Sequence, residues 1–425
     1  MQFKILNKIL DRDLLSKLLN WANKYPYFIY FNPNEKMKNG YGSFSHQIFV
    51  GTKYRVKSQN DSLVQLQHSL DDYSKYHVGY FSYELKNEIE KLTSRNHNTV
   101  SVNHVEFFRP EIIIKFTNDR IIIESEISPD AVWDEIKSTD IFPYENPNYK
   151  PNIQCRTNRE QYLKNCKKIK QDIINGEYYE INYCIEYYAD NCDINPLQKY
   201  LQLNELSPMP FSCLAKFEEK YVLCASPERF IRKKENRLIS QPIKGTIRRG
   251  KNDAEDQQLK TLLRTSQKEL AENMMIIDLV RNDLSKCSNP GTVKVDEFFG
   301  IYTFKQVHQM VSTISSELKN NITVSQIIQN TFPMGSMTGA PKFRVMKAIE
   351  EYEDSQRGIY SGSIGYITPD GDFDFNVVIR SIIYDQKNKK LSFHVGSAIT
   401  YDADPEYEYE ECLLKAKSMM EILKQ

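Results

Sequence analysis

The spacing of apolar residues along the chain predicts a mixture of strands and helices. Short apolar runs bounded by turn residues are typical of strands, and they occur at residues 27–31, 78–83 and 111–116. The last run is expected to form a hairpin with residues 120–126 across Thr117-Asn118-Asp119. Helical spacing marks four longer segments, at residues 13–22, 158–175, 267–285 and 343–352.

The order of these elements favours antiparallel sheets. Residues 211–217 and 220–225 follow one another through the tight turn Glu218-Glu219, and strands joined in this way pair antiparallel. Strands and helices do not alternate as they would in a doubly wound fold. The pattern therefore predicts an α+β protein with large antiparallel sheets.

A proline-rich segment divides the chain. Residues 140–152 carry three prolines among asparagines and tyrosines, which is typical of a linker. We expect an N-terminal part over residues 1–145 and a second part over residues 155–425. Thr157 is expected to open the helix at 158–175 through a capping box with Glu160.

Composition excludes several classes of protein. Lys plus Arg and Asp plus Glu both number 56, so the chain has no basic excess with which to bind nucleic acid. The eight cysteines stand singly without a Cys-x-x-Cys pair, which argues against a zinc or redox motif and for a reducing compartment. The sequence has no signal-like start and no apolar run of about 18 residues. We expect a cytoplasmic protein that does not enter a membrane.

The segment 241–246 presents one lysine on stiff backbone. Pro242 fixes φ before Lys244, and Gly245 permits an unusual backbone conformation after it. Lys244 could act as a nucleophile if desolvation lowers its pKa. The alternative is an ordinary solvated lysine in a turn.

Glu228 ends an apolar strand one hairpin-length before Lys244. Adjacent strands could bring the carboxylate beside the amine as a proton-transfer pair. The alternative for Glu228 is a salt bridge with Arg229 or Arg232.

Two predicted helices begin with paired glutamates. Glu269 and Glu272 are three residues apart, as are Glu408 and Glu411, so each pair shares a helix face. Facing one another, the pairs could hold Mg²⁺, which prefers oxygen ligands. The alternatives are a solvated face and an acidic first turn that complements the helix dipole.

Two further features could bind an anionic substrate. Residues 333–342 are rich in small residues and prolines and lead into a helix, whose free N–H groups favour an anion. Arg380, on a strand expected at 376–383, could grip a carboxylate with two hydrogen bonds. Gly396-Ser397-Ala398 is a small-residue turn with backbone donors.

In this order the motifs Ser-Pro-Glu, Pro-Ile-Lys-Gly-Thr, Glu-Leu-Ala-Glu-Asn, Thr-Gly-Ala-Pro-Lys and Glu-Tyr-Glu-Glu resemble those of the chorismate-utilising enzymes. The resemblance covers residues 155–425. It implies antiparallel sheets that pack face to face and are flanked by helices. Residues 1–145 correspond to the family's divergent N-terminal part, packed on the same core.

The resemblance also implies a reaction. Lys244 is typical of members that convert chorismate and ammonia to 4-amino-4-deoxychorismate, with ammonia supplied by a glutamine amidotransferase subunit. Lys244 is then the nucleophile and Glu228 the acid. Glu272 and Glu411 bind Mg²⁺, supported by Glu269 and Glu408. The positions that match substrate-holding residues are Thr246, Tyr360, Arg380, Gly396 and Lys415.

Three alternatives remain open. An anthranilate synthase component would carry alanine in place of Lys244, and an isochorismate or salicylate synthase would carry a lysine base in place of Glu180. A chain that only binds the amidotransferase would not need the intact Lys244 and Glu228. The chain departs from many relatives at Gln309, where they carry histidine. It lacks their tryptophan-binding motif near Tyr30, so a bound regulatory tryptophan is not expected.

Overall fold

The computed structural model describes residues 1–34, 42–72, 75–142 and 150–424. The centre of the linker expected at residues 140–152 falls at 143–149, outside the described residues. Among the described residues, two large sheets account for the strands. The strand pairs described in both sheets are antiparallel, as the tight connections predict.

The first sheet has twelve strands in the described part of the chain. Its order is β1 (Gln2–Leu6), β8 (Ile121–Ser125), β7 (Ile112–Phe116), β3 (Gln47–Val50), β2 (Tyr27–Asn32), β11 (Phe211–Phe217), β12 (Lys220–Ser226), β21 (Ser381–Asp385), β22 (Lys390–Ile399), β10 (Glu180–Ala189) and β18 (Gly339–Ala340), with β9 (Gln154–Cys155) paired to β10.

The second sheet has ten strands over the same described ranges. Its order is β15 (Ile243–Arg248), β17 (Val307–Glu317), β14 (Arg237–Gln241), β13 (Arg229–Lys234), β20 (Phe373–Asn376), β19 (Ser363–Ile367), β5 (His77–Phe81), β6 (Val105–Arg109) and β4 (Tyr54–Ser58), with β16 (Lys294–Thr303) paired to β17.

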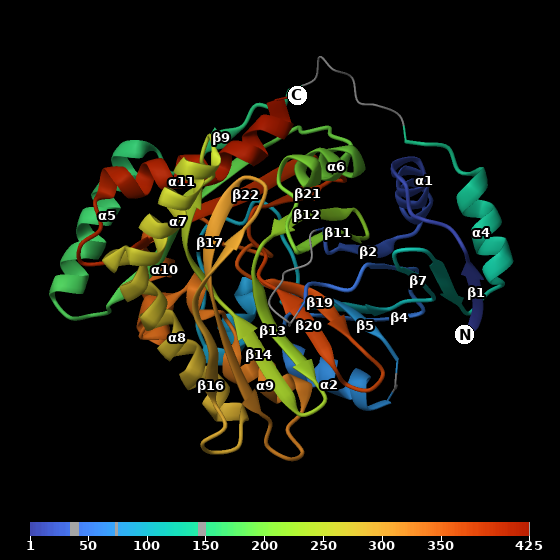
Figure 1. The fold of residues 1–425 in the computed structure, drawn as a ribbon, viewed down its shortest axis with the longest axis horizontal. Helices are drawn as coiled ribbons and strands as arrows, with labels where there is room; N and C mark the ends of the chain where they lie inside the picture. The colour runs from blue at the N-terminus through green and yellow to red at the C-terminus, as the bar shows by residue number, and fades with distance from the viewer. Residues whose placement is uncertain (35–41, 73–74, 143–149, 425) are drawn as a thin grey trace.

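Helices lie outside the sheets (Figure 1). The helices α5, α7, α8, α10 and α11 gather on one side of the molecule, and α1 and α4 lie on the opposite side beside β1 (Figure 1). The helical segments are α1 (Arg12–Ala22), α2 (Ser62–Asp72), α3 (Lys86–Glu90), α4 (Pro129–Ser138), α5 (Arg159–Ile174), α6 (Pro196–Leu206), α7 (Asp253–Thr265), α8 (Gln267–Cys287), α9 (Val324–Thr331), α10 (Lys342–Tyr352) and α11 (Pro405–Lys424), with short 3₁₀ turns at Tyr83–Leu85 and Gly335–Met337.

Strand β2 shows how the sequence builds the layers. Tyr27, Ile29 and Phe31 enter a core shared by the two sheets, which also contains residues of β5 and β19. Phe28 and Tyr30 point the other way, into a second core with the leucines of α1. The period of two along a strand thus buries both faces of β2, which explains its continuous apolar sequence. A third core packs the second sheet against α8 and α9. The predicted α+β fold, with antiparallel sheets face to face and helices outside, is confirmed.

The N-terminal part shares both sheets with the rest of the chain. Strand β2 pairs with β11, and β5 pairs with β19. The division into residues 1–145 and 155–425 stays a prediction. The expected hairpins β7–β8 and β11–β12 are confirmed. The cap of α5 differs from the prediction, because Asn158 accepts the hydrogen bond from Gln161 N whereas Thr157 donates to Asp354.

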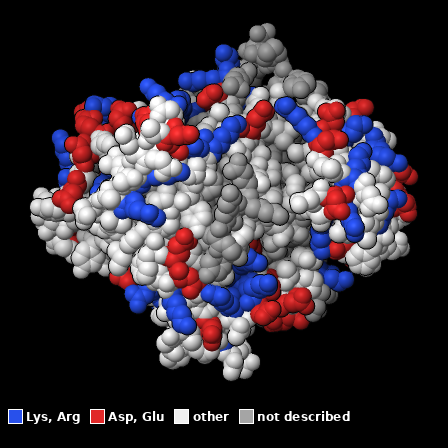
Figure 2. Space-filling model, in the orientation of Figure 1, with Lys and Arg blue, Asp and Glu red and all other residues white. Residues whose placement is uncertain are grey.

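The surface agrees with the balanced composition. Figure 2 shows basic and acidic side chains interspersed over the face in view. No helix within the described ranges combines the length and the apolar character needed to cross a membrane.

A buried ion pair joins β13 to β20. Arg229 and Asp374, 0% and 3% exposed, form two hydrogen bonds of 2.9 and 3.0 Å between the guanidinium and the carboxylate. Arg229 also donates to Gln241 Oε1 at 2.6 Å. The alternative for Glu228 was a salt bridge with Arg229 or Arg232, and the carboxylate described against Arg229 is Asp374.

Asp374→Asn is expected to destabilise the protein by about 3–5 kcal/mol, because it leaves the buried Arg229 charge uncompensated. Urea unfolding measures this change. The control is Asp134→Asn in the exposed pair with Lys137, where we expect a change within about 0.5 kcal/mol. Equal effects of the two substitutions on the free energy of unfolding would contradict the stabilising role of the buried pair between Arg229 and Asp374.

Candidate active site

Lys244 lies on a bulge of strand β15. The register of β15 against β17 shifts between Ile243 and Thr246, so that Lys244 and Gly245 fall in the irregular stretch. Gly245 has φ of +88°, and a Cβ there would lie 2.8 Å from Glu269 Oε2. Only glycine fits this backbone and this close approach. Bulges re-aim side chains next to active sites, and this one directs Lys244 inward.

Lys244 is buried against Glu180 at the start of β10. The side-chain nitrogen lies 2.5 Å from Glu180 Oε1, and the two residues are 9% and 1% exposed. Asn273 on α8 donates to the Lys244 carbonyl at 2.7 Å. The alternative of a solvated turn lysine is wrong.

The charge state of Lys244 differs from the expectation. Burial alone would lower its pKa, but Glu180, Glu272 and Glu228 raise it by more, and the pKa lies above its ordinary value. These carboxylates therefore favour the protonated form of the amine. The condition set for a nucleophile, that desolvation lowers the pKa of Lys244, is not met by burial alone, because the carboxylates outweigh it.

Glu228 is a buried carboxyl near Lys244. It lies in the turn between β12 and β13, 3% exposed, and Ser336 Oγ donates to its Oε1 at 2.6 Å. Burial raises the pKa of Glu228 to about 7, while Ser336 and the charge of Lys244 act in the opposite direction. A carboxyl of this pKa can give or take a proton at neutral pH.

Arg380 lies beside Glu228. It does not lie within a strand, as predicted, but precedes β21 with φ of +51°. Its carbonyl accepts from Ala225 N at 3.2 Å, which joins it to the strand end before Glu228. Burial lowers the pKa of Arg380 to about 10, against the charge of Glu228. Its guanidinium contacts the sulfur of Met209 at 3.8 Å and is suited to bind an anion.

Thr246 and its neighbour Gln309 form another edge of the site. Gln309 Nε2 donates to Thr246 Oγ1 at 3.3 Å, and Gln309 Oε1 is buried with no hydrogen-bond partner among the described residues. His308, one position earlier, turns away from Thr246: its ring bonds Asp256 Oδ1 at 2.9 Å and Thr303 Oγ1 at 3.0 Å.

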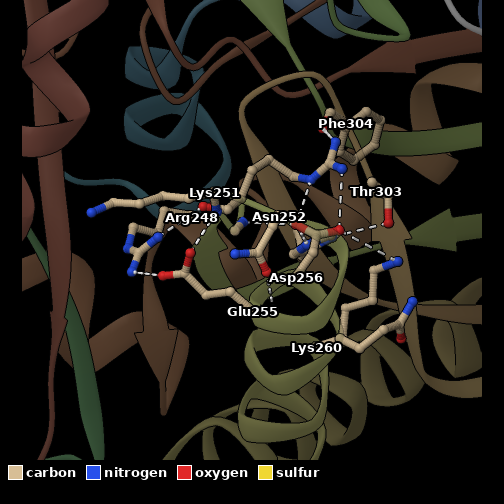
Figure 3. A network of polar contacts seen from close by, with 12 residues as sticks. Arg248, Lys251, Asn252, Glu255, Asp256, Lys260, Thr303 and Phe304 are labelled. Carbon is tan, nitrogen blue, oxygen red and sulfur yellow. Dashed lines mark hydrogen bonds and ion pairs between the residues drawn. The ribbon is translucent and has the colours of Figure 1, made fainter.

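Asp256 is the centre of a structural network (Figure 3). Its carboxylate accepts from Arg249 at 2.8 and 3.1 Å and from Gly250 N at 2.7 Å, besides His308. These bonds tie the end of β15 to the start of α7 and to β17. His308 therefore supports the strand that carries Lys244.

One wall of the site is formed by three residues that are linked by contacts: Gly396, Tyr360 and Lys415. Gly396 is opposite Cys184, whose sulfur lies 3.7 Å from the Tyr360 hydroxyl, and a Cβ on Gly396 would come 2.5 Å from that sulfur. Lys415 donates to the Gly396 carbonyl at 2.8 Å. Gly396-Ser397-Ala398 belongs to β22 and is not the predicted turn. Strand β21 pairs with β22 through residues 390–392, further from the site.

The paired glutamates of α8 and α11 face one another through lysines. Lys268 Nζ lies 2.7 Å from Glu408 Oε1 and 3.9 Å from Glu272 Oε1. Lys415 Nζ lies 2.6 Å from Glu411 Oε1. The alternative of a solvated face is wrong for Glu272 and Glu408, which are 6% and 1% exposed. Glu408 does lie in the first turn of α11, as the helix-dipole alternative expects.

Burial and neighbouring charges shift the pKa values of these glutamates. Burial, with the charges of Glu180 and Glu269, raises the pKa of Glu272 to about 8. Burial also raises the pKa of Glu269 and Glu408. For Glu411 burial acts upward, but Lys415 outweighs it and the pKa falls.

The carboxylate oxygens of these side chains are suitable ligands for a divalent cation. Glu272 Oε1 is buried and has no hydrogen-bond partner in the described part of the chain, so one carboxylate oxygen is available. The donors are oxygens, as Mg²⁺ prefers. In the arrangement observed, however, no three acidic, histidine or cysteine side chains among the described residues are grouped closely enough to hold a metal ion.

The anion site expected at the helix start after residues 333–342 stays a prediction, and no side chain among the described residues caps the first turn of α10. Lys342 is directed inward, where its side-chain nitrogen lies 2.5 Å from Asp283 Oδ2 and 3.2 Å from the Thr331 carbonyl. The segment also contributes Ser336, which holds Glu228.

Sequence reasoning did not assign a role to Glu180, Ser336 or Asn273. Asn273 follows Glu272 in the same motif, and that adjacency could have indicated it. Ser336 contacts a residue 108 positions away, which no local pattern reveals. For Glu180, the replacement of a lysine expected in other branches of the family was the available signal.

Comparisons with known proteins identify relatives of this chain. The chain is 40% identical over 273 residues to the aminodeoxychorismate synthase of Streptomyces griseus, covering 64% of this chain and 37% of that protein. It is 37% identical over 257 residues to aminodeoxychorismate synthase component 1 of Bacillus subtilis (strain 168), covering 60% of this chain and 54% of that protein. The chain thus matches about a third to a half of the length of these curated relatives.

The fold is also found in a solved structure. Anthranilate synthase component I from Streptococcus pneumoniae TIGR4 superposes with a TM-score of 0.74 at 24% identity, covering 99% of this chain and 92% of that one. The profile of the chorismate binding enzymes matches residues 21–421, nearly the whole chain. The chain therefore belongs to the chorismate binding enzyme family.

Proposed function

We propose that this chain is an aminodeoxychorismate synthase component I, which converts chorismate and ammonia to 4-amino-4-deoxychorismate for p-aminobenzoate and folate synthesis. The observation that carries the proposal is the buried Lys244, held in the charge field of Glu228 at the centre of a chorismate-binding fold. The names of the relatives from Streptomyces griseus and Bacillus subtilis support it.

The reaction uses a lysine because ammonia must reach ring carbon C4. Lys244, once neutral, attacks C2 of chorismate while the 4-hydroxyl leaves with a proton from Glu228. The ring double bonds shift, and a C2–N bond replaces the C4–O bond. Ammonia then attacks C4, the double bonds shift back, and the lysine departs as a neutral amine. Glu228 recovers its proton from the new C4 ammonium group.

The substrate's two carboxylates need cationic partners. Arg380 lies beside Glu228 and suits one of them, and Lys415 lies on the wall formed by Gly396 and Tyr360. Thr246, fixed by Gln309, offers a hydroxyl on the strand that carries Lys244. We assign these five residues to substrate binding.

A magnesium ion completes the proposal. Glu272 and Glu411 would bind it, and Glu269 and Glu408 would orient the site through water or hydrogen bonds. Six carboxylates and three cationic groups have been described around Lys244, so negative charge is in excess when all of them and Lys244 are ionised. When bound, Mg²⁺ would hold the ring carboxylate and withdraw electrons from the ring.

Ammonia is proposed to come from a separate glutamine amidotransferase subunit. Glutamine hydrolysis needs an accessible cysteine on a glycine-flanked turn. None of the eight cysteines has a glycine beside it in the sequence, and seven of them are buried. All eight are free, which supports a reducing cytoplasm as the place of the reaction.

Lys244→Ala is expected to lower the rate of 4-amino-4-deoxychorismate formation by at least about a hundredfold, since the nucleophile is removed. Product masses and fluorescence, measured with chorismate, Mg²⁺ and ammonium, give both rate and identity. Any residual product should include anthranilate, because space at C2 becomes free for ammonia. The control is Lys251→Ala, an exposed lysine. An unchanged rate and product in Lys244→Ala would contradict the nucleophile.

Glu272→Gln and Glu411→Gln are each expected to weaken Mg²⁺ binding by about tenfold or more and to lower activity with it, because a charged ligand is lost. Calorimetric titration with Mg²⁺ measures binding independently of turnover. Glu410→Gln is the matched control, since Glu410 is exposed on the same helix. The metal assignment fails if the Glu272 and Glu411 variants bind Mg²⁺ as tightly as the unaltered protein.

The purified chain is expected to form no product from chorismate, Mg²⁺ and glutamine alone. It should turn over with ammonium salts, faster at alkaline pH where more ammonia is neutral. Adding a glutaminase to the glutamine reaction is the control, because it supplies ammonia in place. Efficient turnover with glutamine and no glutaminase would show that the chain has its own glutamine site.

A further inference from the structure

The ion pair between Lys244 and Glu180 bridges the two sheets. Glu180 begins β10 in the first sheet, and Lys244 lies on β15 in the second. The amine and the carboxylate oxygen Oε1 are 2.5 Å apart. The other oxygen, Oε2, is buried and has no hydrogen-bond partner among the described residues. A buried carboxylate with one unsatisfied oxygen is costly, and this one lies at the reacting nitrogen.

The proposed function requires a neutral amine, but Lys244 is held as an ammonium. Its pKa lies above the ordinary value because three carboxylates outweigh the effect of burial. A proton must therefore leave Nζ before the C2–N bond can form. The proton needs an acceptor inside the closed site, since Lys244 is 9% exposed.

The neighbouring carboxylates differ in their availability. Glu228 is the proposed acid and must hold its own proton when the hydroxyl leaves. Glu272 is assigned to Mg²⁺. Glu180 has neither task, and it is already in hydrogen-bond contact with the amine. Proton transfer across such a contact needs no rearrangement of the backbone.

We infer that Glu180 is the base that takes the proton from Lys244 at the start of the reaction and returns it at the end. This inference rests on the proposed function. In the first step an N–H bond of Lys244 breaks and an O–H bond forms on Glu180, so the ion pair becomes a neutral amine and a carboxylic acid. The lysine leaves the ring as a neutral amine in the last step, and Glu180 then protonates it. No other oxidant, reductant or proton donor is needed.

Other charged groups face Lys244 from each neighbouring element. The acidic groups favour the protonated form of Lys244, and Lys415 disfavours it. In the bonds described above, Glu180 is the group that forms a hydrogen bond with the Lys244 amine. The groups are Glu269 and Glu272 on α8, Glu228 between β12 and β13, and Glu411 and Lys415 on α11. All of them are present in both the unaltered protein and a Glu180 variant. Because the charge of Glu180 also raises the pKa of Glu272, a variant that keeps the charge, Glu180→Asp, is needed as a control for this effect.

The test compares Glu180→Gln with the unaltered protein from pH 6.5 to 9.5, in approximate steps of half a unit, with chorismate, Mg²⁺ and ammonium. Glutamine keeps the size of the side chain and can still accept a hydrogen bond, but it cannot take the proton. The ratio of the two rates removes the common effect of pH on ammonia. At pH 7 the variant is expected to be slower by on the order of a hundredfold.

The rate of the unaltered protein divided by the rate of Glu180→Gln is expected to fall as pH rises. At higher pH, solvent removes the proton from Lys244 without the help of Glu180. A ratio that stays constant across the range means that Glu180 only holds Lys244 in place, and it would overturn the inference. So would a variant that matches the unaltered rate at pH 7. An unaltered protein that makes no 4-amino-4-deoxychorismate would instead refute the proposed function.

Two further variants keep the test decisive. Glu180→Asp retains a carboxylate, so its rate ratio should be independent of pH even if its rate is lower. If the ratio of the unaltered rate to the Glu180→Asp rate falls with pH as it does for Glu180→Gln, the assignment of Glu180 as a base would be overturned. Glu186→Gln removes a buried charge from the same strand, where Glu186 pairs with Arg156 at 2.6 Å and does not contact Lys244 in the bonds described. Its ratio is expected to stay constant with pH.

Discussion

The buried charge of Lys244 is the interaction on which the site depends. An ammonium group removed from water is stable only with close counter-charges, and Glu180 supplies the nearest one from the opposite sheet. The same requirement brings Glu228 and Glu272 into the field of the amine. The charges that hold the lysine also favour its protonated form, in which the amine cannot act as a nucleophile.

The fold supplies the geometry for this charge cluster at particular backbone positions. The bulge at Lys244 and the positive φ of Gly245 turn the amine inward and let Glu269 approach the backbone. Asp256 fixes the end of the same strand. Because β15 belongs to one sheet and β10 to the other, the two sheets must keep their packing for Lys244 and Glu180 to meet.

The sequence predicted the strands and helices whose patterns are local. The buried strand at Tyr27–Asn32 and the helix at Gln267–Cys287 follow from the period of their apolar residues. Arg380 was expected in a strand among apolar neighbours, but it has a positive φ, and its carbonyl accepts a hydrogen bond from Ala225 N, which is distant in sequence. Thr157 suggested a helix cap, yet its hydroxyl is used by Asp354 from a distant segment.

In the candidate site, too, the sequence predicted some features and only the structure shows the others. Lys244 and Glu228 stand in motifs whose residue types already suggest chemistry, and the structure brings them into one charge cluster. The protonation of Lys244 could not be predicted, because it depends on Glu180, which is 64 positions away in the sequence. Pattern analysis identifies groups that can react, whereas their charge states depend on which distant groups the fold places beside them.

A covalent bond between Lys244 and the substrate is the step on which the proposed function depends. The most direct measurement is mass spectrometry of the protein mixed with chorismate and Mg²⁺ in the absence of ammonia, followed by rapid acid quenching and peptide mapping. The account predicts a peptide containing Lys244 with the added mass of chorismate less one water, and its disappearance when ammonium is supplied. Product formation at a normal rate with no adduct on Lys244 at any time after mixing would contradict the account.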